Sequence, residues 1–190
     1  MIKLIVILTL LFAPDWILGQ TLNCEIYSKK STIGLGDSLV IKVTLTNISD
    51  SIIYLLGNID GAESKWRHPH CYFVVLNEQG DTIKPEARSC SNFDYLRPKY
   101  FVQVDPNDTF DPHQEGYWPT YFPSSADLAQ GIYRMQFIYS TKNADFEESA
   151  MPRFDRNWDK ALPDEEEISR LWSLLPKETV KSNWIEIEIK

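Results

Sequence analysis

One alternating stretch decides the fold of this 190-residue chain, and it reads Leu39-Val40-Ile41-Lys42-Val43-Thr44-Leu45-Thr46. Its odd-numbered positions are all aliphatic, whereas polar residues hold three of the four even-numbered positions. Side chains of an extended strand point alternately to opposite faces, so a period of two predicts a strand with one buried and one solvated face. Strands of this kind are typical of antiparallel sheets.

Seven further segments read as short strands, with turn-forming glycine, asparagine, aspartate and proline residues between them. Together with the first stretch, the predicted strands are residues 24–27, 39–46, 52–56, 71–76, 81–84, 100–104, 132–139 and 184–189. About eight short strands with such turns predict a β-sandwich. The sequence therefore predicts an all-β domain.

Two features of the chain bear on the kind of sandwich it forms. Gly131-Ile132-Tyr133 opens the strand 132–139 and resembles the tyrosine corner, in which the phenol bonds back to upstream backbone. The stretch 34–50 resembles the second strand of bacterial secreted immunoglobulin-like domains, including the proteinase-inhibitor type. Met135 stands where an antibody domain has its second cysteine, so the resemblance concerns the fold. Over residues 24–140 and 184–190 it implies an immunoglobulin-like antiparallel β-sandwich, and it says little of activity.

The segment 142–183 breaks the strand rhythm and predicts a helical insertion before the last strand. Pro163 and the glutamates at 165–167 suit a helix start, and Pro176 ends the pattern. Between them, apolar residues recur at helical spacing: Ile168, Leu171, Trp172, Leu174 and Leu175. A tryptophan within such a stripe is interpreted as core, so we expect the helix to cap one end of the sandwich.

Residues 1–20 read as a secretory signal peptide. Lys3 precedes an apolar run at 4–13, and cleavage is expected after Gly19 or Gln20. This run is shorter than the roughly 20 apolar residues of a membrane span. The expected mature chain is a single domain of residues 21–190 that is secreted or periplasmic. The alternative is a lipoprotein anchored at Cys24, although the preceding Leu22-Asn23 lacks the small residues of that motif.

Composition excludes some classes of partner. The chain is 43% hydrophobic and 13% aromatic, enough for a core, and its formal net charge is −8. Nucleic-acid binding depends on clustered lysine and arginine, so we expect neither nucleic acid nor an anionic membrane surface as a partner. Nothing in the composition implies a cofactor.

Three cysteines follow the predicted leader, namely Cys24, Cys71 and Cys90. In an oxidising compartment two of them are expected to pair. If residues 71–84 form a hairpin, Cys71 lies opposite Glu86, four residues short of Cys90. The shortest loop is therefore closed by a Cys71–Cys90 disulfide, and Cys24 remains open as an alternative partner.

Two patterns carry catalytic or metal-binding chemistry in other proteins. Gly36-Asp37-Ser38-Leu39 resembles the motif of a family of serine esterases, in which Asp-x-x-His completes the triad. Here the positions three before His68, His70 and His113 are Lys65, Arg67 and Phe110, so Ser38 lacks the expected base. His68-Pro69-His70-Cys71 offers zinc or copper ligands. On a strand, however, only the two histidines share a side.

A third pattern, at 105–111, starts like a calcium loop. It then departs from that motif, because Phe110 replaces the glycine and Gly116 replaces the bidentate glutamate. We therefore expect a solvated turn here and no bound metal.

One aromatic stretch is the expected recognition surface. Residues 113–122 contain four rings among prolines, namely Tyr117, Trp118, Tyr121 and Phe122. Rigid rings on loops supply contact area at low entropic cost. The first hypothesis is therefore a non-enzymatic secreted module that binds a protein or a glycan. The alternatives are a secreted proteinase inhibitor and a small serine hydrolase that uses Ser38.

Overall fold

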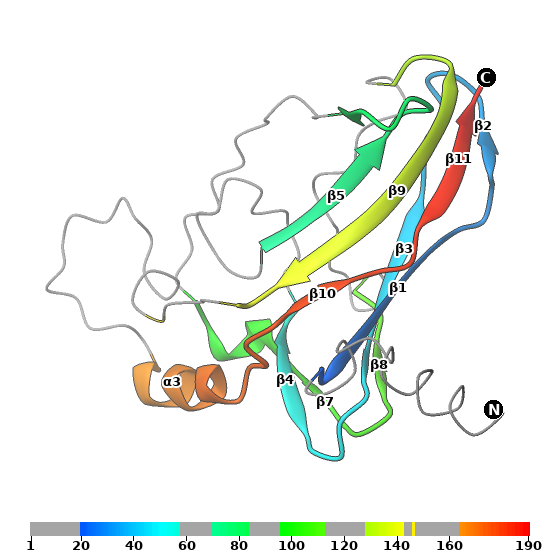
Figure 1. The fold of residues 1–190 in the computed structure, drawn as a ribbon. Coiled ribbons are helices and arrows are strands. Elements are labelled where there is room, and N and C mark those ends of the chain that lie inside the picture. Colours follow the sequence, from blue (N-terminus) through cyan, green and yellow to red (C-terminus); the bar gives the residue numbers. More distant parts are fainter. Residues whose placement is uncertain (1–19, 58–69, 84–95, 113–127, 143–145, 147–163) are drawn as a thin grey trace, which may run out of the picture.

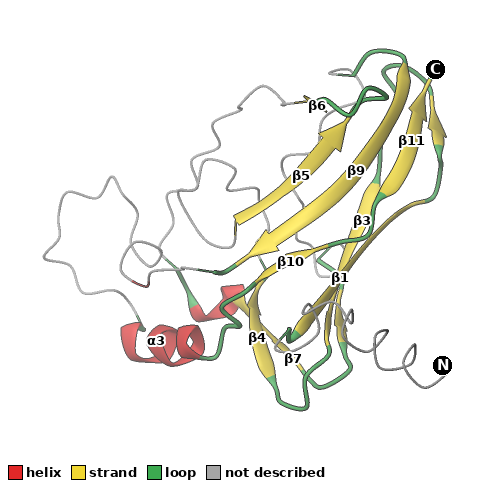
Figure 2. Cartoon of the chain, in the orientation of Figure 1, coloured by secondary structure: helices red, strands yellow, loops and turns green. Residues whose placement is uncertain are grey.

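The described residues form three β-sheets, two larger ones and a two-stranded one, together with a short α-helix (Figure 1). The computed structural model describes residues 20–57, 70–83, 96–112, 128–142, 146 and 164–190. Helix α3 (Glu165–Ser173) follows strand β9 in the chain and precedes the last two strands. Figure 2 shows it beyond one end of the strands. The predicted class, an immunoglobulin-like β-sandwich with a helical insertion, is confirmed.

The first sheet has the order β1-β3-β8, with β1 at Leu22–Ser28, β3 at Ile41–Asn47 and β8 at Thr109–Phe110. Its pairs are antiparallel. In β3 the side chains of Ile41, Val43 and Leu45 are buried, and the residues between them are half-exposed. This confirms the alternation that the sequence predicts.

The second sheet has the order β2-β11-β9-β5-β6. Its strands are β2 (Thr32–Ile33), β11 (Ile185–Ile189), β9 (Gly131–Ser140), β5 (His70–Leu76) and β6 (Thr82–Ile83). A further strand, β10 (Thr179–Lys181), pairs with the end of β9. One pairing differs from the expected antiparallel pattern, because β2 runs parallel to β11.

The hairpin of β5 and β6 forms as expected but in a different register. Val75 pairs with Ile83, whereas the predicted pairing of Cys71 with Glu86 would place Val75 opposite Thr82. The difference arises in the turn, where the amide of Asn77 donates to the carbonyl of Asp81 at 3.0 Å. Gly80 has a φ of 84°, a conformation that glycine adopts without strain.

The tyrosine corner is present. The hydroxyl of Tyr133 donates to the backbone carbonyl of Ala129 at 3.0 Å. The ring of Tyr133 is itself buried in the core between the sheets. Phe73 of β5 and Phe137 of β9 pack in the same core, with ring centroids 5.0 Å apart. The corner thus fixes the chain as it enters the longest strand.

A second apolar cluster lies under helix α3. Strands β4 (Ile53–Leu56) and β7 (Phe101–Val104) form a separate two-stranded ladder, and the 3₁₀ turn η2 (Pro98–Tyr100) precedes β7. The buried members of the cluster are Leu56, Leu96, Phe101, Ile168, Leu171, Trp172 and Leu175. The helix therefore caps one end of the sandwich, as predicted. Leu174 is the exception, since it is 42% exposed.

Candidate functional site

The predicted recognition residues Tyr117, Trp118, Tyr121 and Phe122 lie outside the described residues. They belong to the connection between β8 of the first sheet and β9 of the second. Connections between sheets are a common position for binding loops in sandwiches. The assignment of these four rings stays a prediction.

Ser38 is exposed and directly follows a turn, far from the one histidine that the structure describes. The amide of Asp37 donates to the carbonyl of Gly34 at 2.9 Å, which closes the turn after β2. Ile33 and Gly131 both pair with Ile189 at one end of the second sheet. His70 pairs with Ser140 at the other end of β9, roughly 30 Å away at the rise of a strand. His68 and His113 lie outside the described residues.

The His-Pro-His-Cys stretch has the expected geometry at His70 and Cys71, the two of its residues that the structure describes. His70 is half-exposed and Cys71 is buried, so the two side chains point to opposite faces of β5. Within the ranges described, no three histidine, cysteine or carboxylate side chains gather as metal ligands would.

Residues 105–111 form the connection from β7 to β8. The amide of Asp108 donates to the carbonyl of Asp105 at 3.0 Å, and the side-chain amide of Gln103 donates to the Asp105 carboxylate at 2.8 Å. Phe110 is buried in the core opposite Leu45. These interactions are those of a turn that joins two strands.

Two of the three cysteines lie in the described part of the chain. Cys24 and Cys71 are both buried in the main core, whereas Cys90 lies outside the described residues. The Cys71–Cys90 disulfide therefore stays a prediction. Burial, with the Glu25 carboxylate adding to it, raises the pKa of the Cys24 thiol to about 12. The thiol is thus protonated at physiological pH, which makes it a poor nucleophile and metal ligand.

Tyr139 is another titratable group in the core, and its side chain also helps to hold two strands together. Burial raises the pKa of Tyr139 far above its ordinary value, and nearby Cys71 adds to this effect. Its hydroxyl accepts a hydrogen bond from the backbone amide of Leu56 at 3.3 Å. The neutral phenol thus ties β9 to β4.

Asn47 is a buried polar residue whose role the sequence did not reveal. Its side-chain amide donates to the carbonyls of Ser51 at 2.8 Å and Val104 at 2.9 Å. Its carbonyl oxygen accepts from the amide and the hydroxyl of Ser49, at 2.9 and 2.7 Å. Asn47 therefore holds the connection from β3 to β4 against the end of β7.

Two polar side chains near the C-terminus bridge the sheets, and we call this pair, Glu178 and Asn183, the inter-sheet seam. The Asn183 amide donates to the carbonyl of Ile26 at 3.0 Å and its oxygen accepts from the Ile26 amide at 2.8 Å. Glu178 accepts two hydrogen bonds from the Thr21 amide, at 3.2 and 3.3 Å, and one from the Thr21 hydroxyl. Both residues connect the second sheet to strand β1 or to the residue before it.

A one-residue bulge directs Asn183 toward β1. Lys181 of β10 pairs with Ile138 and Ile185 of β11 pairs with Met135, so four residue steps between β10 and β11 face three along β9. At the bulge the Ser182 hydroxyl accepts from the Phe137 amide at 2.9 Å. Bulges re-aim side chains in this way. Sequence reasoning missed the seam because its partners are 157 residues apart.

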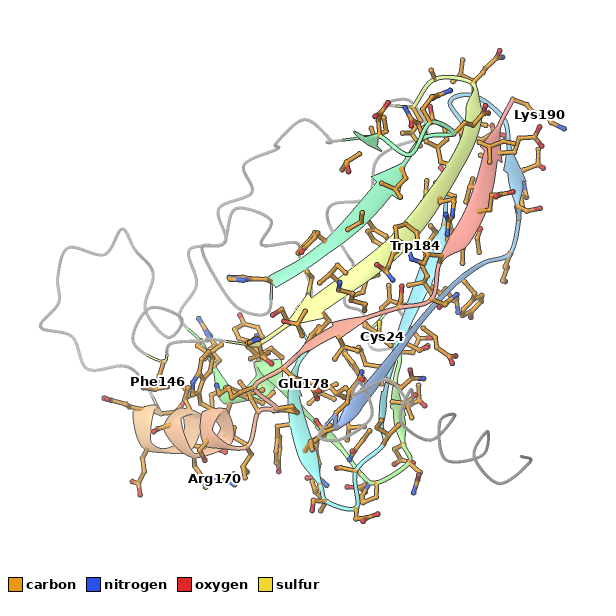
Figure 3. The ribbon with its side chains drawn as sticks, in the orientation of Figure 1. Cys24, Phe146, Arg170, Glu178, Trp184 and Lys190 are labelled. Carbon is orange, nitrogen blue, oxygen red and sulfur yellow. The ribbon has the colours of Figure 1, made fainter. Side chains whose placement is uncertain are left out.

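The outer face of the second sheet carries two half-exposed aromatic side chains, Tyr72 and Trp184, each 37% exposed. Trp184 is labelled in Figure 3 beside strands β9 and β11. The Arg134 guanidinium lies over the Trp184 ring, 5.1 Å from its centroid. This contact holds the indole against the sheet.

No helix in the described part of the chain has the length and apolar character needed to cross a bilayer.

Comparison with known proteins gives little beyond architecture. No family model and no curated protein sequence matches the chain. Two similar solved structures are of the CARDB domain of the PF1109 protein from Pyrococcus furiosus, one a crystal structure in complex with di-metal ions and one a solution NMR structure. Each is 12% identical at a TM-score of 0.30; the matches cover 89% of this chain and 87% and 94% of those chains. The immunoglobulin-like β-sandwich itself follows from the strand order above.

Proposed function

We propose that the chain is a non-enzymatic β-sandwich module that works outside the cytoplasm and binds a protein or a glycan. The observation that supports this most is the use of the polar side chains in the described core. The buried Asn47, Tyr133 and Tyr139 each hold a strand, a turn or a sheet in place. Such groups build a scaffold, and on a rigid scaffold the binding residues belong to the connections.

The aromatic residues at 117–122 are the proposed recognition surface. They lie in the connection that leads from β8 to the tyrosine corner at the start of β9. The corner and the buried β9 strand give that connection a fixed end. Aromatic side chains on a loop whose end is fixed lose little conformational entropy on binding.

Export rests on the leader-like residues 1–20. The fold supports removal of that segment near Gly19 rather than acylation at Cys24. Leu22 and Asn23 pair with Asn47 and Thr46 in β1, and Leu22 and Cys24 are buried. A lipoprotein cut before Cys24 would lose the first two residues of the strand and would need its buried thiol at the surface.

A binding experiment with a matched aromatic control tests the proposal. The purified exported protein is applied to a panel of immobilised polysaccharides and to immobilised extracytoplasmic protein extract. Trp118→Ala and Tyr121→Ala should each weaken binding at least about tenfold, the effect of losing a central aromatic anchor. Trp184→Ala removes a half-exposed ring from the sheet face and should leave binding unchanged. Equal loss in all three variants, or binding by none of the proteins, would refute the assignment.

A further inference from the structure

The carboxylate of Glu178 accepts hydrogen bonds from Thr21, the residue directly before β1. Both of its oxygens accept from the Thr21 amide, at 3.2 and 3.3 Å, and Oε1 also accepts from the Thr21 hydroxyl. Glu178 lies at the end of the sandwich where β1 starts (Figure 3). All the hydrogen bonds that its carboxylate makes within the described chain therefore converge on one residue.

No basic side chain among the described residues forms an ion pair with this carboxylate. The ion pairs found there join Lys42 to Asp111 and Lys190 to Glu188. Lys177, the neighbour in sequence, instead places its ammonium over the Trp172 ring, 4.3 Å from the centroid. A half-buried carboxylate gains from a nearby positive charge. Glu178 thus has hydrogen-bond donors but no counter-charge on any described side chain.

We propose that Glu178 binds the α-ammonium group that leader removal creates. The inference rests on the export proposed above. Hydrolysis breaks one peptide bond, with water adding hydroxide to the carbonyl carbon of the leader and a proton to the new amine, which a second proton converts to ammonium. Cleavage after Gln20 puts the charge on the nitrogen that Glu178 already contacts. Cleavage after Gly19 puts the charge on the nitrogen of Gln20, which lies within about 4 Å of the Thr21 nitrogen along the backbone.

This contact would fasten the first strand after processing. The Thr21 carbonyl already accepts from the Ile48 amide at 2.8 Å, so the residue is held on both sides. An ammonium adds a full charge and three donors where the amide has one. The charged and titratable groups nearby are Lys142, whose amide donates to the Glu178 carbonyl, Lys177, the neighbour in sequence, and the buried Tyr139. Tyr139 is neutral, because burial raises its pKa.

Two measurements on the exported protein test the inference. Intact mass gives the first residue, and labelling with limiting acetic anhydride across pH gives the α-amine pKa. A free α-amine ordinarily has a pKa of about 7.7–8.0, and pairing with Glu178 should raise it by at least about half a unit. Glu178→Gln should restore the ordinary value. Glu186→Gln makes the same charge change at an exposed position of β11 and should keep the raised value.

The outcomes separate this inference from the proposed export. A mass that still includes residues 1–19 would refute export and this site together. A processed chain whose α-amine pKa is the same in wild type and Glu178→Gln, or whose N-terminus is blocked, would overturn the site alone. If Glu178→Gln does not fold, the α-amine pKa of the wild-type protein still tests the inference. A raised folded-state pKa stabilises the protein below about pH 7.7, and this stability is lost as pH rises through the folded value. Chemical acetylation of the α-amine should abolish that pH dependence.

Discussion

Replacing Asn47 tests how the first sheet is joined to the β4-β7 ladder. The Asn47 side chain is 0% exposed and makes four hydrogen bonds, two as donor and two as acceptor. Asn47→Ala leaves the carbonyls of Ser51 and Val104 without their amide donor. The buried Val104 carbonyl left unsatisfied costs roughly 1–3 kcal/mol, and the part-buried bond to Ser51 adds about 1 kcal/mol. The variant should therefore lose about 2–4 kcal/mol of unfolding free energy.

The assay is urea unfolding followed by tryptophan fluorescence, with a thermal melt beside it. For a chain of this size each kcal/mol lowers Tm by roughly 2–4 °C, so the expected fall is about 5–15 °C. Thr46→Ala is the matched control. It removes a neighbouring side chain whose one hydrogen bond, to the Thr109 hydroxyl at 2.9 Å, is exposed, and it should cost under about 1 kcal/mol.

Asn47→Asp separates the two halves of the network. It keeps the shape and the acceptor to Ser49 but removes both donors, so a carboxylate would face two carbonyl oxygens. Burial and these oxygens should raise its pKa above the usual value of about 3.9. A raised folded-state pKa means that the variant is least destabilised at acid pH and loses stability as pH rises through that value. An Asn47→Ala variant as stable as Thr46→Ala, or an Asn47→Asp variant whose deficit does not change with pH, would refute this account.

Three further changes test other parts of the structure. Tyr133→Phe removes the bond to the Ala129 carbonyl and should cost about 1 kcal/mol in urea unfolding; an unchanged midpoint would mean that the tyrosine corner is dispensable. Cys24, with a pKa raised to about 12, should resist iodoacetamide in the native protein and react once it is unfolded, as peptide mass mapping would reveal. Trp172→Ala empties the cluster under α3 and should cost roughly 3–5 kcal/mol, against under about 1 kcal/mol for the half-exposed Leu174→Ala.

Long periodic elements were predictable because their signal is local. The alternation in β3, β9 and β11 marks which residues face the core, and the structure buries Val43, Met135 and Ile187 accordingly. The helix could be read from Ile168, Leu171 and Trp172 for the same reason. In each case, burial of one face requires apolar residues at regular spacing over at least two periods of the strand or helix.

Short and non-local features could not be predicted. Strands β2 and β8 have two residues each and β10 has three, too few to show a period. The hairpin register depends on the hydrogen bonds of Asn77 in the turn rather than on strand composition. Of the candidate site, Ser38 was expected to open a strand but lies before β3, which begins at Ile41, whereas the aromatic stretch lies outside the described residues.

The inter-sheet seam holds the free edge of the first strand. The bulge at Ser182 turns Asn183 toward Ile26, and the Asn183 amide then pairs with both backbone groups of that residue, as a neighbouring strand would. This covers part of the free edge of β1, and an open edge invites pairing with another chain. Glu178 holds the residue before the same strand. Both contacts come from residues 178–183, so they can form only after that segment has been made, whereas the pairing of β1 with β3 needs only the residues up to Asn47.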